Sequence, residues 1–216
     1  MKIIVDMDEV LVQFVQKVLD RWNKEFGTTY TRDQITGWSM EDILEPHKPG
    51  LIDEWCAEKG FFLDMEPMPG AIEGFNYLRA KGHDVCVGTS ILKNAVNCYD
   101  DKRAWMRKHF PDWSMKNFFA ISRKEFLTAD MLLDDGSHNI KAWLDSGKHG
   151  AVVFDAPWNR EPELMNSCMP HELDRVSGWK ELMESMEEQE RLSELLRKGS
   201  EEALKHSIRL SRGFHP

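Results

Sequence analysis

The chain begins with a short β-branched run that ends in two carboxylates. Ile3, Ile4 and Val5 favour a strand that is buried on both faces. Asp6 and Asp8 follow where that strand must end. In an open parallel sheet the carboxyl ends of the strands form the binding crevice, and residues two apart on an extended chain face the same way. The run therefore predicts that both carboxylates face one small site at the edge of a parallel sheet.

Two carboxylates this close need a compensating charge. Like charges repel unless a cation or a shared proton lies between them. Because oxygen ligands suit Mg²⁺, Asp6 and Asp8 are candidate ligands of a magnesium ion. The alternative is a strand that ends in an ordinary polar turn, where Asp is common. Taken alone, the pair favours that alternative, so the rest of the chain must decide.

Further along the chain, short apolar runs alternate with segments of helical periodicity. The apolar runs predict strands at residues 84–88, 118–121, 131–133 and 151–154. The periodic segments predict helices at residues 11–26, 71–80, 102–110 and 140–144. Strands that alternate with helices imply right-handed crossovers and a parallel sheet covered on both faces. We therefore expect an α/β fold.

Two segments break this alternation. Residues 28–70 are aromatic and acidic and contain several prolines, so we expect an irregular helical insertion between the first and second strands. After residue 177, apolar residues recur at helical spacing among many charges, at Leu182, Met183, Met186, Leu192, Leu195 and Leu196. Gly199 and Ser200 predict a stop and a new N-cap before a second short helix. This tail suits a docking helix, a crossing arm or an oligomer contact, and a homodimer is one arrangement that it allows.

Length and charge restrict the classes of function. The 216 residues allow one sizeable domain and an accessory piece. The net charge of -9 argues against a nucleic-acid polymer as partner, but it leaves room for a small phosphorylated substrate. Four scattered cysteines suit a reducing compartment. The first apolar run is too short for a signal peptide and no stretch reaches transmembrane length, so we expect a cytoplasmic protein without a membrane partner.

Three of the predicted strands end in small polar or acidic groups. These residues are Asp6, Asp8, Thr89, Ser90, Asp134 and Asp135. A parallel sheet brings all three ends to one edge, so their convergence is a more specific signal than any one of them. Lys124, shortly after the third strand, supplies a cation for a phosphate group.

Segments of the chain resemble, in order, the four motifs of the haloacid dehalogenase (HAD)-type phosphohydrolases. These segments are residues 6–10, residues 87–90, Lys124 and residues 132–135. More narrowly, the chain is similar to the 5'(3')-deoxyribonucleotidases through residues 60–62, 66–71, 89–93, 102–105 and 122–124. The resemblance covers most of residues 1–180 and leaves out the tail.

The resemblance implies a fold and its domains. The fold would be a HAD-like Rossmannoid three-layer sandwich with a central parallel sheet, a small helical cap inserted after the first strand, and a helical C-terminal tail. The core would consist of residues 1–13 and 69–178, and the cap of residues 14–68. Residues 179–216 would form the helical extension.

The resemblance also implies catalytic roles. Asp6 would attack the substrate phosphorus and form an aspartyl-phosphate. Asp8 would give a proton to the leaving oxygen and then take one from water. The Asp6 carboxylate, the Asp8 backbone carbonyl and Asp135 would hold Mg²⁺, with Asp134 beside it. The choice between Asp134 and Asp135 as the direct ligand stays open.

The phosphate-binding residues follow from the same pattern. Thr89 and Ser90 would hold the phosphoryl oxygens, and Lys124 would neutralise developing charge. Lys102 is a rival lysine because it is near Thr89 and Ser90 in sequence. The family pattern favours Lys124, which precedes the strand that bears Asp134.

The implied function is a Mg²⁺-dependent 5'-nucleotidase that acts on (deoxy)ribonucleoside monophosphates. Phe14, Trp38 and Ser39 fall where base contacts are expected, and Lys93 falls near the sugar-phosphate edge. Phe62 offers another flat apolar face. Aromatic residues in a small cap also serve simply as core. The alternatives are a phosphatase for another small phosphomonoester, or a non-catalytic binding module with the same fold.

The chain departs from the family pattern near the site. Glu9 stands where these enzymes usually carry Gly, so it is either turned outward or alters metal affinity or substrate choice. Gly136 stands where some relatives carry Arg, and Gly37 precedes Trp38 in place of another aromatic residue. These departures leave the catalytic inference intact and leave nucleotide specificity open.

Overall fold

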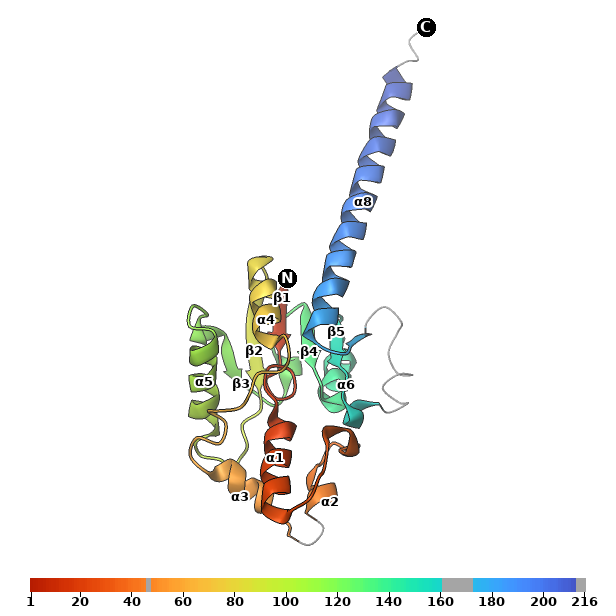
Figure 1. The fold of residues 1–216 in the computed structure, drawn as a ribbon. Coiled ribbons are helices and arrows are strands. Elements are labelled where there is room, and N and C mark those ends of the chain that lie inside the picture. The colour runs from red at the N-terminus through yellow and green to blue at the C-terminus, as the bar shows by residue number, and fades with distance from the viewer. Residues whose placement is uncertain (46–47, 161–172, 213–216) are drawn as a thin grey trace. The chain divides into compact units, whose positions relative to one another are not determined.

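The structure is a computed structural model that describes residues 1–45, 48–160 and 173–212. The chain forms two compact units, Met1–Trp179 and Lys180–Pro216. The first unit contains a six-stranded parallel sheet (Figure 1). Its strands, in spatial order, are β3 (Phe118–Ala120), β2 (Asp84–Thr89), β1 (Lys2–Val5), β4 (Met131–Asp134), β5 (Ala151–Phe154) and β6 (Leu173–Val176). The strands expected from the apolar runs and the α/β fold are confirmed.

Strand β6 is absent from the sequence prediction because its centre is polar. It lies at the edge of the sheet, where it pairs with β5 alone. Arg175, in the middle of β6, donates to Asp155 Oδ1 at 2.7 Å and to Asn159 Oδ1 at 2.7 Å. An edge strand can carry such side chains, so it lacks the continuous apolar run of a central parallel strand.

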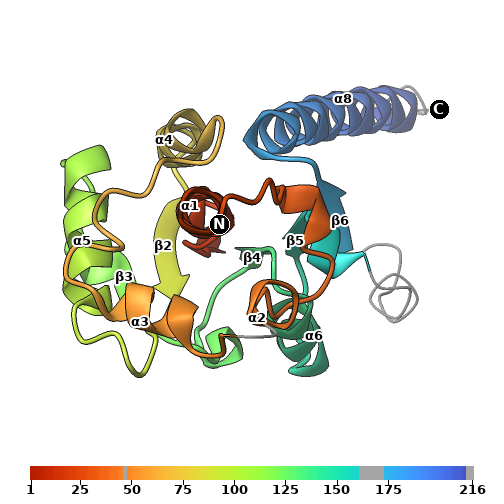
Figure 2. The same ribbon diagram turned by 60° about the horizontal axis from the view of Figure 1, so that its bottom comes forward.

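Helices cover both faces of the sheet. The longer ones in the first unit are α1 (Phe14–Phe26), α4 (Ala71–Ala80), α5 (Cys98–His109) and α6 (Ser137–Asp145), and the short 3₁₀ turns between later strands are η2 (Met115–Asn117), η3 (Lys124–Phe126) and η4 (Pro157–Asn159). In Figure 2, α4 lies on one face and α6 on the other. Trp143 of α6 belongs to a buried cluster with Ile4 and Leu132. Phe75 of α4 packs on Phe110, with ring centroids 4.3 Å apart.

Helix α1 begins three residues later than the periodicity predicts. The chain between β1 and α1 folds back in a tight loop, in which the N–H groups of Leu11 and Val12 both donate to the Met7 carbonyl, at 2.8 and 3.0 Å. Val12 also forms a bridge with Pro67. The apolar side chains of this loop are buried, which is why they continue the helical pattern of α1 without being helical. The helix ends at Gly27 as predicted, in the left-handed conformation.

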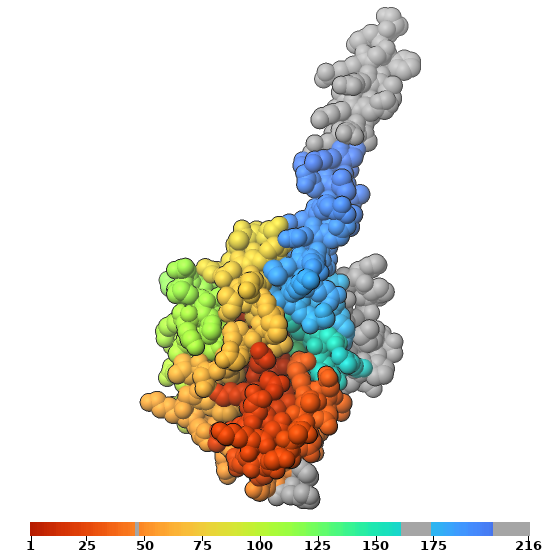
Figure 3. Space-filling view, in the orientation of Figure 1, coloured from red at the N-terminus to blue at the C-terminus, as the bar shows by residue number. Residues whose placement is uncertain are grey.

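The insertion after β1 lies beyond the carboxyl ends of the strands. We call residues 14–68 the cap segment; besides α1 it contains η1 (Arg32–Gln34), α2 (Glu41–Leu44) and α3 (Leu51–Ala57). Figure 1 shows it, in red to orange, at the end of the sheet to which β1 leads, and Figure 3 shows the surface of the same segment in the same colours. Its aromatic residues pack on one another, and the Trp22 and Trp55 ring centroids lie 5.9 Å apart. The aromatic composition of the segment therefore supplies a small core of its own.

The C-terminal tail forms one helix, α8 (Trp179–Arg212). The predicted stop at Gly199 and new N-cap at Ser200 are wrong. A helix ends at glycine when that residue adopts a positive φ, and Gly199 is not among the glycines that do so. A glycine inside a helix costs only about 1 kcal/mol, which the flanking helix formers outweigh. Within the described residues, no helix is both long and apolar enough to cross a membrane.

We predict that Gly74→Ala destabilises the protein. A Cβ on Gly74, inside α4, would lie 2.0 Å from Cε3 of Trp179. That ring cannot move aside freely, because it is buried and its Nε1 donates to the Val10 carbonyl at 2.7 Å. The overpacking should lower the free energy of unfolding in urea by about 2 kcal/mol, despite the better helix propensity of Ala.

The matched control is Gly199→Ala, the same change inside a helix but with no atom within 4 Å of the new Cβ. It should not lower the free energy of unfolding. Equal stability of Gly74→Ala and the wild type would contradict the packing of Trp179 on α4.

Candidate active site

The parallel register brings the ends of β1, β2 and β4 to one edge of the sheet. Val5 pairs with Val87 of β2 on one side and with Leu133 of β4 on the other. Asp6 follows directly, and its N–H donates to the Leu133 carbonyl at 2.9 Å. The residues that follow these strands therefore lie close together in space.

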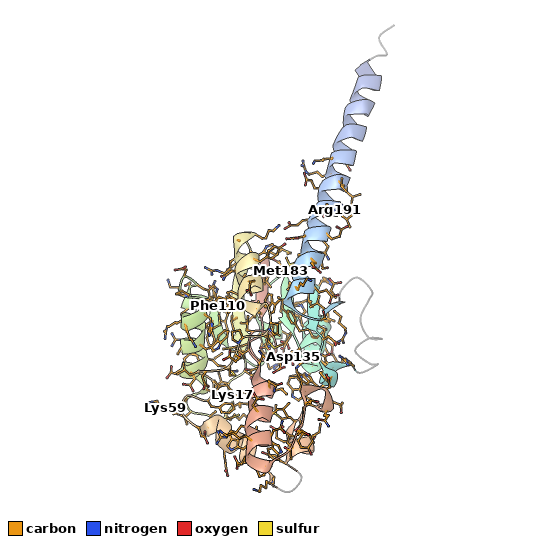
Figure 4. All side chains as sticks on the ribbon, viewed as in Figure 1. Lys17, Lys59, Phe110, Asp135, Met183 and Arg191 are labelled. Carbon is orange, nitrogen blue, oxygen red and sulfur yellow. The ribbon has the colours of Figure 1, made fainter. Side chains whose placement is uncertain are left out.

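Three buried carboxylates gather at this edge. Asp6, Asp134 and Asp135 each offer one oxygen atom, and these atoms all lie within 4.8 Å of one another. In the part of the chain that the structure describes, this is the group that can hold a metal ion. Figure 4 shows Asp135 between the strands and the helices of the cap segment. Asp8 lies at the same edge, but its side chain is 32% exposed and stands outside the three-carboxylate group.

Lys124 is the buried cation of this group. It lies in η3, between β3 and β4. Its Nζ is 2.7 Å from Asp6 Oδ1 and also contacts Asp134 Oδ2. The side chain is almost wholly withdrawn from solvent, so its charge acts on the two carboxylates with little screening. The structure therefore brings together Asp6, Lys124 and Asp134, as the sequence predicts.

Asp134 is held by further donors. The Gly136 N–H donates to its Oδ1 at 2.8 Å, and Asn139 Nδ2 donates to the same atom at 3.0 Å. A Cβ at residue 136 would lie 3.0 Å from Asn139 Nδ2 and 3.1 Å from Asp134 Oδ1. This crowding gives a physical reason for glycine at position 136.

Lys102, the rival lysine of the sequence analysis, also belongs to the site. Its Nζ donates to Asp8 Oδ2 at 2.6 Å, to Thr89 Oγ1 at 2.9 Å and to the Ser90 carbonyl at 3.0 Å. The side chain is fully buried. The signal in the sequence is its place on α5, one turn from Cys98 on the apolar face of the helix, where an unpaired lysine would be costly.

Burial and charge oppose one another in this cluster. Burial raises the pKa of Asp6 to about 7, because the Lys124 ammonium only partly offsets it and the charges of Asp134 and Asp8 add to the rise. Burial, Asp134 and Asp6 also raise the pKa of Asp135. For Lys124, burial alone would lower the pKa, but Asp134 and Asp6 outweigh it and the net shift is upward. One ammonium thus leaves three buried carboxylates under-compensated, and a divalent cation with oxygen preference fits the donor set.

A cavity of about 320 Å³ opens above the carboxylates. The core contributes Asp6, Asp8, Ser90 and Asp135 to its wall. The cap segment contributes apolar groups that include Ile35, Met40, Ile52 and Cys56. Later parts of the chain contribute Leu92, His138 and Trp158. A mainly apolar cavity with a few charged groups at its floor is typical of a small-molecule site.

The predicted substrate-binding residues fall into two groups. Phe14, Trp38, Ser39 and Phe62 line the cavity. The rings of Phe14 and Phe62 are parallel within 3°, with centroids 6.1 Å apart, and Trp38, 57% exposed, meets His138 edge-on with ring centroids 4.4 Å apart. Lys93 is exposed and is not among the lining residues.

Glu9 points inward, so the outward alternative is wrong. Its side chain is buried, accepts the Val15 N–H at 2.7 Å and pairs with Arg32 at 3.0 Å. Burial raises its pKa, although these two donors oppose the rise. On the other side of the site, Trp158 Nε1 donates to Asp135 Oδ2 at 2.8 Å. Neither Arg32 nor Trp158 was expected at the site, because no short motif marks either residue.

Comparison with known proteins identifies the family. The family model described as "5' nucleotidase, deoxy (Pyrimidine), cytosolic type C protein" matches residues 1–190. The chain belongs to this family. A Bordetella bronchiseptica protein named as a 5'(3')-deoxyribonucleotidase is 30% identical over 164 residues, which cover 74% of this chain and 87% of that protein. A Staphylococcus epidermidis protein of the same name is 26% identical over 181 residues, which cover 84% and 93%.

Solved structures show that this nucleotidase-family chain has the expected HAD-like fold. A HAD family hydrolase from Deinococcus radiodurans, with bound phosphate and sodium, has a TM-score of 0.57 at 15% identity and covers 87% of this chain and 95% of its own. A family IA HAD hydrolase from Entamoeba histolytica has a TM-score of 0.52 at 13% identity and covers 83% and 94%. The resemblance stated from the sequence motifs is confirmed at the level of family and fold.

We predict a pH-dependent difference in stability between Asp6→Asn and the wild type in EDTA. The folded-state pKa of Asp6, about 7, lies above its ordinary value of 3.8. The neutral form is therefore favoured by folding, and the contribution of Asp6 to stability is present below about pH 4 and lost as the pH rises through 7. Asn stays neutral throughout. Between pH 4 and pH 8, the free energy of unfolding of the variant should rise relative to that of the wild type by on the order of 1 kcal/mol or more. Urea unfolding at each pH measures this difference. A difference that does not change with pH would contradict the burial of an ionisable Asp6.

Proposed function

We propose that this protein is a Mg²⁺-dependent 5'(3')-deoxyribonucleotidase that hydrolyses nucleoside monophosphates to nucleoside and phosphate. The observation that carries the proposal is the meeting of Asp6, Asp134, Asp135 and Lys124 in a member of this family. Asp6 and Asp135 of this cluster line a largely apolar cavity. Asp6 follows β1, Lys124 lies in η3 between β3 and β4, and Asp134 and Asp135 lie at the end of β4. Proximity in sequence therefore does not explain why Asp6 meets the other three residues.

The first step is attack by Asp6. A carboxylate oxygen of Asp6 forms a bond to the substrate phosphorus as the bond from phosphorus to the nucleoside oxygen breaks. The leaving oxygen takes a proton from Asp8. Water then attacks the phosphorus of the aspartyl-phosphate and gives a proton to Asp8, so that phosphate leaves and Asp6 is restored.

The contacts of Asp8 support its acid–base role. Its Oδ2 accepts a hydrogen bond from Lys102 at 2.6 Å. No group within the described residues bonds to Oδ1, although that atom is shielded from solvent. A buried carboxylate oxygen without a donor is costly, so its natural partner is a reactant in the cavity.

The phosphoryl group would be bound by hydroxyls and ammonium groups. Thr89 and Ser90 would donate to its oxygens, and Lys124 would neutralise the charge that develops on it. Lys102 would hold Thr89 and Asp8 in place from the other side, since its Nζ contacts both. When bound by the Asp6 carboxylate, the Asp8 backbone carbonyl and Asp135, with Asp134 beside them, Mg²⁺ would offset the charge between nucleophile and phosphate.

The nucleoside would occupy the apolar part of the cavity. Phe14, Trp38 and Phe62 line it and offer flat surfaces, and Ser39 offers a polar group beside them. Lys93 would act at the exposed sugar-phosphate edge. We further propose a core of residues 1–13 and 69–178, a cap of residues 14–68 and an extension of residues 179–216. The cytosolic type of the family supports a cytoplasmic location, and a homodimer stays a prediction.

We predict that phosphate release from deoxyribonucleoside monophosphates requires Mg²⁺ and Asp6. A screen across nucleoside monophosphates should give turnover that EDTA abolishes and Mg²⁺ restores. Asp6→Asn should lose activity by about a thousandfold or more, because the amide is not a nucleophile. Turnover of Asp6→Asn at the wild-type rate would refute the covalent mechanism. A preference for a sugar phosphate over every nucleotide would favour another small phosphomonoester as substrate.

We predict that Trp38→Ala separates nucleotide binding from chemistry. Loss of the exposed indole should raise KM for a nucleotide about tenfold, while kcat/KM for p-nitrophenyl phosphate should change by less than about threefold. The generic aryl phosphate serves as the internal control, because it uses the same carboxylates. Equal losses on both substrates would count against a base-stacking role for Trp38.

A further inference from the structure

Glu9 has a backbone conformation that its residue type disfavours. Among the described residues it is the one non-glycine residue with a positive φ, at 58°. Its side chain is also buried, at 4% exposure. Glycine would adopt this backbone without strain, and a buried carboxylate needs partners. The side-chain contacts of Glu9 must therefore do something that glycine cannot.

Those contacts join Glu9 to two elements of the cap segment. Its Oε1 accepts the Val15 N–H at 2.7 Å, in the first turn of α1, where an N–H group has no partner within the helix. Its Oε2 accepts from Arg32 Nε of η1 at 3.0 Å. One carboxylate thus ties both the start of α1 and η1 to the loop that carries Asp6 and Asp8.

Arg32 continues the connection to the other side of the site. Its guanidinium lies over the ring of Trp158, 4.7 Å from the centroid. Trp158 is buried, and its Nε1 donates to Asp135 Oδ2 at 2.8 Å. The ring is therefore held on its face by the cap segment and at its edge by a carboxylate of the metal-binding group.

We propose that Glu9, Arg32 and Trp158 form a chain of contacts, here called the relay, that couples the position of the cap segment on the core to the orientation of the Asp135 carboxylate. With Oδ2 held by Trp158, the carboxylate of Asp135 has a fixed direction toward the carboxylates beside it. Groups that orient a metal ligand in this way typically affect metal affinity strongly. The relay deepens the proposed function and rests on it, because it gives a role to the cap segment in assembling the Mg²⁺ site.

A purely structural role is the competing explanation, since a buried ion pair also affects folding when one partner is lost. The chain offers a matched control within the cap segment. Arg21 pairs with Glu58 through two hydrogen bonds of 2.6 and 2.7 Å, and its guanidinium lies 4.4 Å from the Trp55 ring centroid. It has the same kinds of partner as Arg32 but contacts neither Trp158 nor Glu9 in any described interaction.

The test measures Mg²⁺ affinity without turnover, from the Mg²⁺ concentration that raises the unfolding temperature by one fixed amount, because that concentration scales with the Kd. Arg32→Met and Glu9→Gln should each raise that concentration about tenfold or more, and the double variant should add little to either. Arg21→Met should leave it within about twofold of the wild type. Trp158→Phe keeps a ring beneath Arg32 but removes the N–H, and it should reproduce the loss seen in Arg32→Met.

Wild-type Mg²⁺ affinity in both Arg32→Met and Trp158→Phe would overturn the relay, as would additive effects of Glu9→Gln and Arg32→Met. If Arg32→Met does not fold, Arg32→Lys keeps the charge but loses the planar stacking group and should still weaken Mg²⁺ binding. The readout needs no substrate. A wild-type protein that binds Mg²⁺ through the relay but hydrolyses no nucleotide would therefore refute the proposed function and leave the relay standing.

Discussion

The site depends on keeping several carboxylates out of water in one place. Asp6, Asp134 and Asp135 are buried together, and a single ammonium group, that of Lys124, lies against two of them. Burial disfavours their charged forms, and the upward pKa shifts of Asp6 and Asp135 express that cost. The fold therefore holds an excess of negative potential at this point, which a divalent cation fits. Such a cation would also favour the ionised form of Asp6, which the proposed attack on phosphorus requires.

The backbone produces this cluster through the central position of β1. Because β2 and β4 flank β1 in parallel register, the groups after all three strands share one edge. Two lysines then contact the loop that carries Asp6 and Asp8. Lys124 reaches Asp6 from η3, and Lys102 reaches Asp8 from α5. The cap segment closes the same edge and supplies most of the apolar wall of the cavity.

The sequence predicts well those features that a short local pattern determines, such as a buried strand and the residue at which it ends. The run Ile3 to Val5 predicts a central strand because strands buried on both faces are continuously apolar, and the positions of Asp6 and Asp134 follow from strand ends. The patterns fail where three-dimensional context decides. A polar edge strand such as β6 leaves no apolar run, and Gly199 does not end α8 because its flanking residues continue the helix. The sequence pattern favours Lys124 over Lys102, because the contacts of Lys102 with Asp8 and Thr89 form only in the folded chain. The inward direction of Glu9 likewise depends on Arg32, a cap residue 23 positions away in sequence.

The most direct test of the carboxylate cluster is a crystal structure with Mn²⁺ in place of Mg²⁺, because anomalous scattering locates that ion without ambiguity. We expect an anomalous peak within ligand distance, about 2.2 Å, of carboxylate oxygens from Asp6 and Asp135. The Nζ of Lys124 should stay in contact with Asp6. Strong peaks elsewhere on the molecule and none between these two carboxylates would contradict the proposed metal site and the chemistry built on it.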